Sequence, residues 1–149
     1  MSDWPSHVLA SGVLVWDTSG RLLMVKTHNR DTLILPGGIV EPAESPAVAG
    51  QREVLEEVGL EVSVGRLLAV QHLGPEGEKP SSVQFVFDSE PLVGSPELTL
   101  QTEEIEAAHW LDPGEAVALH GARGQARMSA ALHAHAGGPV VFLDATRAP

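Results

Sequence analysis

The sequence predicts one domain over residues 1–149, of the α/β class, built as an α+β sandwich with a mixed β-sheet between helices. Three observations predict it. The 149 residues are the length of one ordinary domain, and a chain of this size buries roughly 70% of its unfolded surface. Hydrophobic residues make up 43% and charged residues 19% of the chain, as in globular rather than disordered proteins. Short strand-like segments also alternate with segments of helical pattern.

The N-terminal part of the chain predicts strands. Two apolar runs, Val8–Trp16 and Leu22–Val25, flank a turn that ends in Gly20, which is typical of a hairpin. A short extended piece, Leu33–Leu35, follows. It should end in a tight loop at residues 36–38, because Pro removes a hydrogen-bond donor and the two Gly residues permit a positive φ.

A helix is predicted over residues 46–58. Ser45 suits the N-cap, Pro46 suits the first helical position, and Gly59 suits the residue just past the end. Spacings of seven and three residues predict that one apolar stripe of this helix packs on the core. Its members are Val48, Leu55 and Val58.

The remaining chain predicts further strands and an Ala-rich helical tail. Phe85 and Phe87 alternate on one strand, so they could face a pocket, although core packing is the simpler interpretation. His133 and His135 are expected at the surface, since a metal-binding pair on a helix needs a spacing of four. The expected strands cover residues 62–73, 83–87, 98–100 and 140–143, and residues 103–111 are expected to form a charged approach to a strand that carries Trp110. The expected helices cover 114–120 and 125–135.

Composition excludes several classes of protein. The chain has no cysteine, so a disulfide scaffold, a zinc–thiolate site, an iron–sulfur cluster and a thiol nucleophile are ruled out. Its net charge of −11 disfavours nucleic acid polymers and anionic membranes as partners. A small polyanion is still compatible with this charge if divalent cations lie between the carboxylates and the phosphates. No apolar run is long enough for a membrane span or a signal, so a cytoplasmic location is expected.

Acidic residues gather at the end of the predicted helix. On a helix, Glu56 and Glu57 each lie within about 60° of Glu53, and Arg52 lies one turn before Glu56. Like charges four residues apart repel, and carboxylates in a last turn oppose the helix dipole. Two interpretations follow: a solvated acidic face partly neutralised by Arg52, or a site for a hard cation such as Mg²⁺ or Mn²⁺.

A longer pattern surrounds these acids and resembles the signature of the Nudix hydrolases (MutT-like). Pro36-Gly37-Gly38 before the helix and an acidic segment before Trp110 extend the resemblance to roughly residues 8–111. The matching signature positions are Gly38, Glu44, Arg52, Glu53, Val54, Glu56, Glu57, Gly59 and Leu60.

The resemblance implies a role for each of these residues. It implies one to three Mg²⁺ or Mn²⁺ ions bound by Glu53, Glu56 and Glu57 with the Gly37 carbonyl, and Arg52 orienting Glu53. A later loop glutamate, Glu104 first and Glu103 second, would complete the metal set or act as the base, a role that Glu53 could also fill. The residues implied to shape the signature loop and helix end are Gly38, Glu44 and Gly59.

The implied reaction is attack of water on a diphosphate linkage in a nucleoside diphosphate derivative. Lys26, Arg30 and Gly38 are candidates to contact the substrate, although the two cations are equally plausible as surface residues. Pro75 resembles a feature of ADP-ribose-cleaving members, but a chain with 11 prolines can place one there by coincidence. The absence of tyrosine argues against diadenosine polyphosphates. Nucleoside triphosphates, 8-oxo-dGTP and ADP-sugars remain, and a homodimer is also expected. The alternative is a non-catalytic module that senses a nucleotide or binds a protein.

Overall fold

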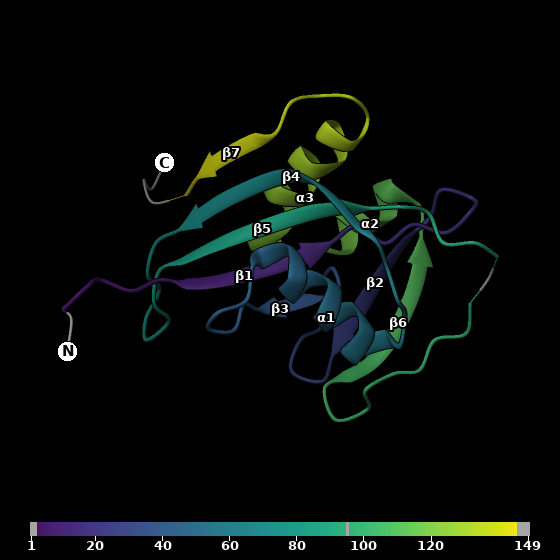
Figure 1. Ribbon diagram of the computed structural model, residues 1–149, viewed down its shortest axis with the longest axis horizontal. Coiled ribbons are helices and arrows are strands. Elements are labelled where there is room, and N and C mark those ends of the chain that lie inside the picture. The colour runs from purple at the N-terminus through teal and green to yellow at the C-terminus, as the bar shows by residue number, and fades with distance from the viewer. Residues whose placement is uncertain (1–2, 95, 146–149) are drawn as a thin grey trace.

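The computed structural model describes residues 3–94 and 96–145 and folds them into two β-sheets and three helices (Figure 1). The larger sheet has the strand order β3-β1-β5-β4-β7, and the smaller sheet pairs β2 with β6. The strands are β1 Val8–Val13, β2 Leu22–Thr27, β3 Gly37–Ile39, β4 Val64–Leu73, β5 Ser82–Ser89, β6 Ile105–Leu111 and β7 Val141–Asp144. The helices are α1 Pro46–Val58, α2 Pro113–Leu119 and α3 Ala122–His135.

The larger sheet is mixed and lies between helices, which confirms the predicted class. Strand β1 is parallel to β5 and antiparallel to β3, whereas β4 is antiparallel to β5 and parallel to β7. Helix α1 packs on β1 and β3, and α3 packs on β4 and β5 (Figure 1). The alternating side chains of the strands can therefore be buried on both faces of the sheet.

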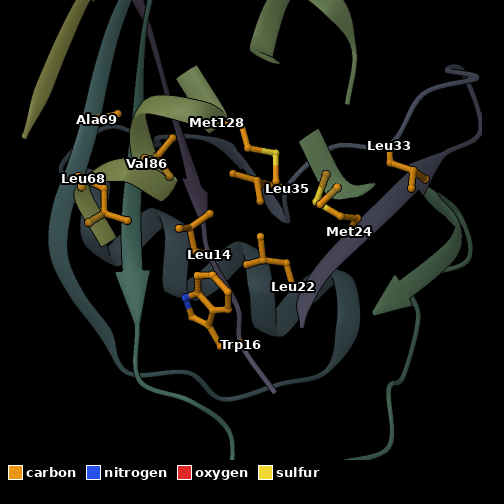
Figure 2. Packing of buried hydrophobic residues seen from close by; sticks show 13 residues of the cluster. Leu14, Trp16, Leu22, Met24, Leu33, Leu35, Leu68, Ala69, Val86 and Met128 are labelled. Atoms are coloured by element: carbon orange, nitrogen blue, oxygen red, sulfur yellow. The ribbon is translucent and has the colours of Figure 1, made fainter. Parts of the chain in front are cut away.

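The core has two parts, one on each side of the sheet. Val13 and Val15 belong to the part that packs on α1, and Leu14 and Trp16 belong to the part that packs on α3. Figure 2 shows this second part, where Leu14, Trp16 and Leu22 lie close together. Successive residues of one run thus fill opposite faces, which explains why residues 13–16 are all apolar.

The ends of α1 confirm the predicted capping. Ser45 Oγ accepts a hydrogen bond from the Val48 N–H at 3.2 Å, and Pro46 is the first helical residue. Gly59 has a φ of 72° and donates its N–H to the Leu55 carbonyl at 3.0 Å. A residue without a Cβ adopts this left-handed conformation at little cost, so the helix stops there.

The predicted apolar stripe of α1 is wrong for two of its three members. Val48 is 57% exposed and Leu55 is 47% exposed, whereas Val58 is buried as expected. The helix instead lays a face with small residues on β1: a Cβ added to Gly50 would lie 2.9 Å from Val13 Cγ2. This buried face therefore includes one charged residue, Glu57. The residues of α1 that are buried are Ala49, Gly50, Val54, Glu57 and Val58.

The predicted N-terminal hairpin forms only at its turn. Asp17 donates its N–H to the Arg21 carbonyl at 3.0 Å, and Leu23 donates to the Val15 carbonyl at 3.0 Å. Beyond that turn the two strands separate, because β1 pairs with β5 along its whole length and β2 pairs with β6. Long-range pairing overrides the local hairpin signal here.

Two further expectations are corrected. The segment after Pro36 is not a loop but strand β3, paired antiparallel with β1. Gly37 allows that approach, since a Cβ at this position would lie 2.0 Å from the Ser11 carbonyl oxygen. Residues 98–100 form no strand; Thr99 donates instead to the Val58 carbonyl at 2.9 Å, which satisfies the end of α1.

The extended piece predicted at residues 33–35 forms only isolated bridges, from Leu33 to His120 and from Ile34 to Val25. The remaining predicted elements are found within a few residues of their expected bounds. Phe87 is buried and stacks against the partly buried Phe85, with ring centroids 6.4 Å apart. His133 and His135 are exposed as predicted, and His135 stacks on Trp16. In the described ranges, every helix is too short or too polar to cross a membrane.

Candidate functional site

The acidic side chains of α1 meet strand β3. The Glu57 carboxylate is 4% exposed and accepts a hydrogen bond from the Gly37 N–H at 2.8 Å. Burial raises the pKa of Glu57 to about 8; the Gly37 bond opposes this shift, and the charges of Glu53, Glu104 and Glu56 add to it. Burial and the neighbouring carboxylates therefore both disfavour the charged form of Glu57 in the metal-free protein.

Arg52 organises the outer side of this cluster. Its Nε and Nη2 donate to the two oxygens of Glu44 at 2.8 and 2.9 Å. Its Nη1 donates to Glu53 and to Glu56, both at 3.1 Å, and Nη2 also reaches the Ile39 carbonyl at 3.1 Å. The Arg52 bond, with help from the Glu41 backbone N–H, lowers the pKa of Glu44 to about 2. The Arg52 guanidinium thus links Glu44, in the loop before α1, to the carboxylates of Glu53 and Glu56 on the helix.

Glu104 faces the same cluster from a distant part of the chain. Its charge helps to raise the pKa values of both Glu53 and Glu57, after burial as the main cause. The turn that carries it is anchored to α1, because the Gln101 N–H donates to the Glu57 carbonyl at 3.0 Å. Glu103, the second choice from the sequence, is exposed, as Glu104 is, but is not among the main causes of these two pKa shifts.

The second glycine of β3, Gly38, leaves room for a carboxylate. A Cβ on Gly38 would lie 2.5 Å from both Cδ and Oε1 of Glu53. Because Glu53 is also held by Arg52, the carboxylate could not make way without losing that bond. Glycine is therefore required at position 38, because the Glu53 carboxylate occupies the space that a Cβ would need.

Gly38→Ala is expected to lower activity while leaving stability almost unchanged. The added methyl group pushes a flexible side chain rather than backbone, so the free energy of unfolding should fall by no more than about 1 kcal/mol. The displaced Glu53 carboxylate should cost roughly tenfold or more in kcat. Thermal unfolding and steady-state kinetics of the same preparation check both parts, and wild-type kcat in this variant would contradict the placement of Glu53.

The predicted substrate-contacting residues fall in different places. Arg30 is exposed and lines a groove of about 560 Å³ that also includes Gly37 and Gly38. Lys26 forms an ion pair with Glu106 across the β2–β6 sheet, so its ammonium group already has a partner.

The sequence missed the other basic residues of this groove, since they come from segments far apart in the chain. They are Lys79 before β5, and Arg123 and Arg127 on α3.

The donor chemistry of the cluster fits a hard divalent cation. Carboxylate oxygens are the ligands that Mg²⁺ and Mn²⁺ prefer, and four glutamates share this negative field. Across the described residues, no three acidic or histidine side chains have already converged on one point in metal-binding geometry. Arg52 and the Gly37 N–H hold the carboxylates instead, so binding would require them to turn toward the ion.

The metal-free protein is expected to lose stability as the pH rises from about 5 to 8. Glu57 has an ordinary pKa of 4.5 when unfolded and about 8 when folded, so only the unfolded chain releases this proton in that window. Proton release therefore favours unfolding. Urea unfolding in EDTA should show a steeper fall with pH for the wild type than for Glu57→Gln. Parallel pH profiles for the two proteins would show that Glu57 titrates normally.

Known proteins share this sequence and this fold. The NUDIX domain model matches residues 6–132. A MutT-like protein of Streptomyces ambofaciens is 35% identical over 111 residues, which cover 74% of this chain and 68% of that protein. The 8-oxo-dGDP phosphatase NUDT18 of Danio rerio is 35% identical over 105 residues, covering 68% of this chain and 31% of that longer protein.

The likeness of fold extends to solved structures. The MutT protein from Methanosarcina mazei Go1 superposes with a TM-score of 0.74 and 21% identity, covering 90% of this chain and 99% of that chain. The family match covers α1, β3 and the turn that carries Glu104. The chain therefore belongs to the Nudix hydrolase family, whose members are pyrophosphohydrolases.

Proposed function

We propose that this protein hydrolyses a diphosphate linkage in a nucleoside diphosphate derivative, with Mg²⁺ or Mn²⁺ as cofactor. The observation that carries the proposal is the buried Glu57 carboxylate beside Gly37, within a group of four glutamates. Gly37, which binds Glu57, also lines the groove. Several carboxylates gathered around a buried one favour a divalent cation, and a divalent cation favours a phosphate-bearing substrate.

The residues of the site would have two roles, cation binding and the orientation of the cation ligands. Glu53, Glu56 and Glu57, together with Glu104 and the Gly37 carbonyl, would hold the cation. When bound, a divalent cation neutralises phosphate charge and lowers the pKa of a coordinated water. Arg52 keeps Glu53 and Glu56 in place through its two 3.1 Å bonds and would continue to orient Glu53.

The reaction joins a water oxygen to one phosphorus and breaks that phosphorus–oxygen bond of the anhydride. Glu53 or Glu104 would accept the proton that the water loses, and the leaving phosphate would take up the electron pair of the broken bond. Phosphoryl transfer has a loose transition state, so positioning and charge stabilisation account for most of the rate. The 3.1 Å ion pair between Glu53 and Arg52 supports such positioning.

The groove would hold the remainder of the substrate. Phe85 contributes an aromatic wall and Arg30 a charged rim, so a ring and a phosphate could both be accommodated. The relative from Danio rerio is named an 8-oxo-dGDP phosphatase. This name supports an oxidised guanine nucleotide, such as 8-oxo-dGDP or 8-oxo-dGTP, as a substrate to test. ADP-ribose is the second candidate substrate. The role of Lys26 in substrate binding stays a prediction, since Glu106 holds its ammonium group.

A substrate panel with Mg²⁺ tests the proposal. Nucleoside di- and triphosphates, their 8-oxo-guanine forms, ADP-ribose and nucleotide sugars are compared at equal concentration, with phosphate and nucleotide release as readouts. We expect one class to exceed the others roughly a hundredfold in kcat/KM. Absence of turnover on all of them, with Mg²⁺ and Mn²⁺, would favour the non-catalytic sensing module instead.

Glu56→Gln tests the assignment of the cation site in the proposed enzyme. Glu56 is partly exposed and pairs with Arg52, so the amide should leave the fold intact. Loss of a metal ligand should reduce activity by about 10- to 100-fold. Full activity in this variant would show that the cation site is assigned wrongly.

A further inference from the structure

The groove beside the acidic cluster is unusually basic for this protein. The chain has nine Lys and Arg residues and a net charge of −11, yet four of the nine line this one groove. They come from three separate segments: Arg30 after β2, Lys79 before β5, and Arg123 and Arg127 from α3. Cations that an acidic protein gathers from distant segments indicate an anionic ligand.

Among these four residues, Arg127 gives the strongest evidence for an anionic ligand. Its guanidinium is largely buried, and its Nη1 donates to the Gln71 Oε1, a neutral acceptor, at 2.5 Å. Over the described ranges, no carboxylate lies within ion-pair distance of Arg127. Burial, with the nearby Arg123 charge, lowers the pKa of Arg127 to about 10. The guanidinium therefore remains charged at neutral pH, and a buried charge without a counter-ion is costly.

The residues around Arg127 leave space for its side chain at the groove. A Cβ on Gly124 would lie 3.0 Å from Arg127 Nη2 and 2.2 Å from His120 Cε1, so glycine there makes space for both side chains. His120 is 7% exposed and its Nδ1 lies 3.0 Å from the Gly121 carbonyl. Burial first, and then the charges of Arg127 and Arg30, lower the pKa of His120, so it adds no competing charge. Arg123 differs, because it pairs with Glu76 at the groove rim.

We propose that this basic end of the groove binds a second phosphate group of the substrate, carried by the part of the molecule beyond the scissile diphosphate. The proposal rests on the proposed function, which places the scissile diphosphate at the Glu53–Glu57 end. Gly37 and Gly38 line the same groove as Arg127, so one extended molecule can reach both ends. The implied substrate class is a diphosphate that also bears a phosphate monoester. An uncharged nucleoside end would leave Arg127 without a counter-ion.

Inorganic phosphate, titrated into EDTA-treated protein and followed by NMR of the backbone amides, tests this site apart from catalysis. Amides of residues 121–124 should shift with a saturable curve. Arg127→Met should weaken phosphate binding roughly tenfold, since a charge-assisted donor is lost. Arg30→Met, at an exposed position that does not endanger folding, should weaken it roughly threefold. The matched control is Arg21→Gln, because Arg21 pairs with Asp17 away from the groove and should bind as the wild type does.

A matched substrate pair tests the same site during turnover. ADP-ribose and ADP-ribose 2′-phosphate differ by one phosphate monoester. We expect the phosphorylated member to have a roughly tenfold lower KM at similar kcat, and Arg127→Met to abolish that difference. Equal phosphate binding by wild type, Arg127→Met and Arg30→Met, or no binding at all, would overturn the proposal. If neither substrate is hydrolysed, the proposed function fails, and the metal-free titration still decides whether the phosphate site exists.

Discussion

Glu53→Gln is expected to reduce kcat by roughly 100-fold or more without unfolding the protein. The amide oxygen can still accept the 3.1 Å bond from Arg52, so the local packing should survive. What is lost is the negative charge, and with it a cation ligand and a candidate acceptor for the proton of the attacking water. Single-turnover and steady-state rates at saturating substrate and Mg²⁺ measure the effect on kcat.

The matched control for this substitution is Glu103→Gln. Glu103 lies beside Glu104 in sequence and is exposed, as Glu104 is, but only Glu104 is among the charges that raise the pKa values of Glu53 and Glu57. Its kcat should remain within about twofold of the wild type, as for most exposed substitutions. If Glu53→Gln also stayed within that range, Glu53 would have no part in the chemistry, and Glu104 would become the sole candidate for the base.

Gly37→Ala is expected to reduce the free energy of unfolding by about 2–4 kcal/mol. The new Cβ would lie 2.0 Å from the Ser11 carbonyl oxygen and 2.8 Å from the Gly12 Cα, and both are backbone atoms of the neighbouring strand. Strand β3 would have to move away from β1, which would also break the bond from the Gly37 N–H to Glu57. Urea unfolding followed by tryptophan fluorescence measures the loss.

Gly114→Ala controls for the general effect of removing a glycine. Gly114 lies in the first turn of α2, and a Cβ there meets no atom within 4 Å. Alanine should leave stability unchanged or raise it by up to about 1 kcal/mol, because glycine is a poor helix former. If Gly37→Ala lowers the free energy of unfolding by less than about 1 kcal/mol, strand β3 can move away from β1 at little cost, and the close contact at Gly37 is not important for stability.

Local signals in the sequence predicted the parts of the fold that depend on a few adjacent residues. Ser45, Pro46 and Gly59 locate both ends of α1, because capping is decided by hydrogen bonds and backbone conformations within one turn. The acidic cluster on that helix was predictable for the same reason, since helical geometry fixes which of its glutamates share a face.

Features that depend on tertiary packing were not predictable in this way. Spacing selected Val48 and Leu55 for the core, yet the helix approaches the sheet through Gly50, a contact that no helical period reveals. Strand β3 pairs with β1 through Gly37, whose lack of a Cβ allows the close approach. The basic groove joins Arg30 to Arg127, residues that only the folded chain brings together.

The dependence of turnover on Mg²⁺ tests the central claim most directly. EDTA-treated protein is assayed on its best substrate from the panel while Mg²⁺ is returned stepwise, and the same titration is run on Glu57→Gln. The wild type should show no turnover in EDTA and should recover saturably with Mg²⁺, and Glu57→Gln should need roughly 10- to 100-fold more Mg²⁺. Turnover that persists in EDTA, or an identical Mg²⁺ requirement in the two proteins, would contradict a cation site built on the carboxylates of α1.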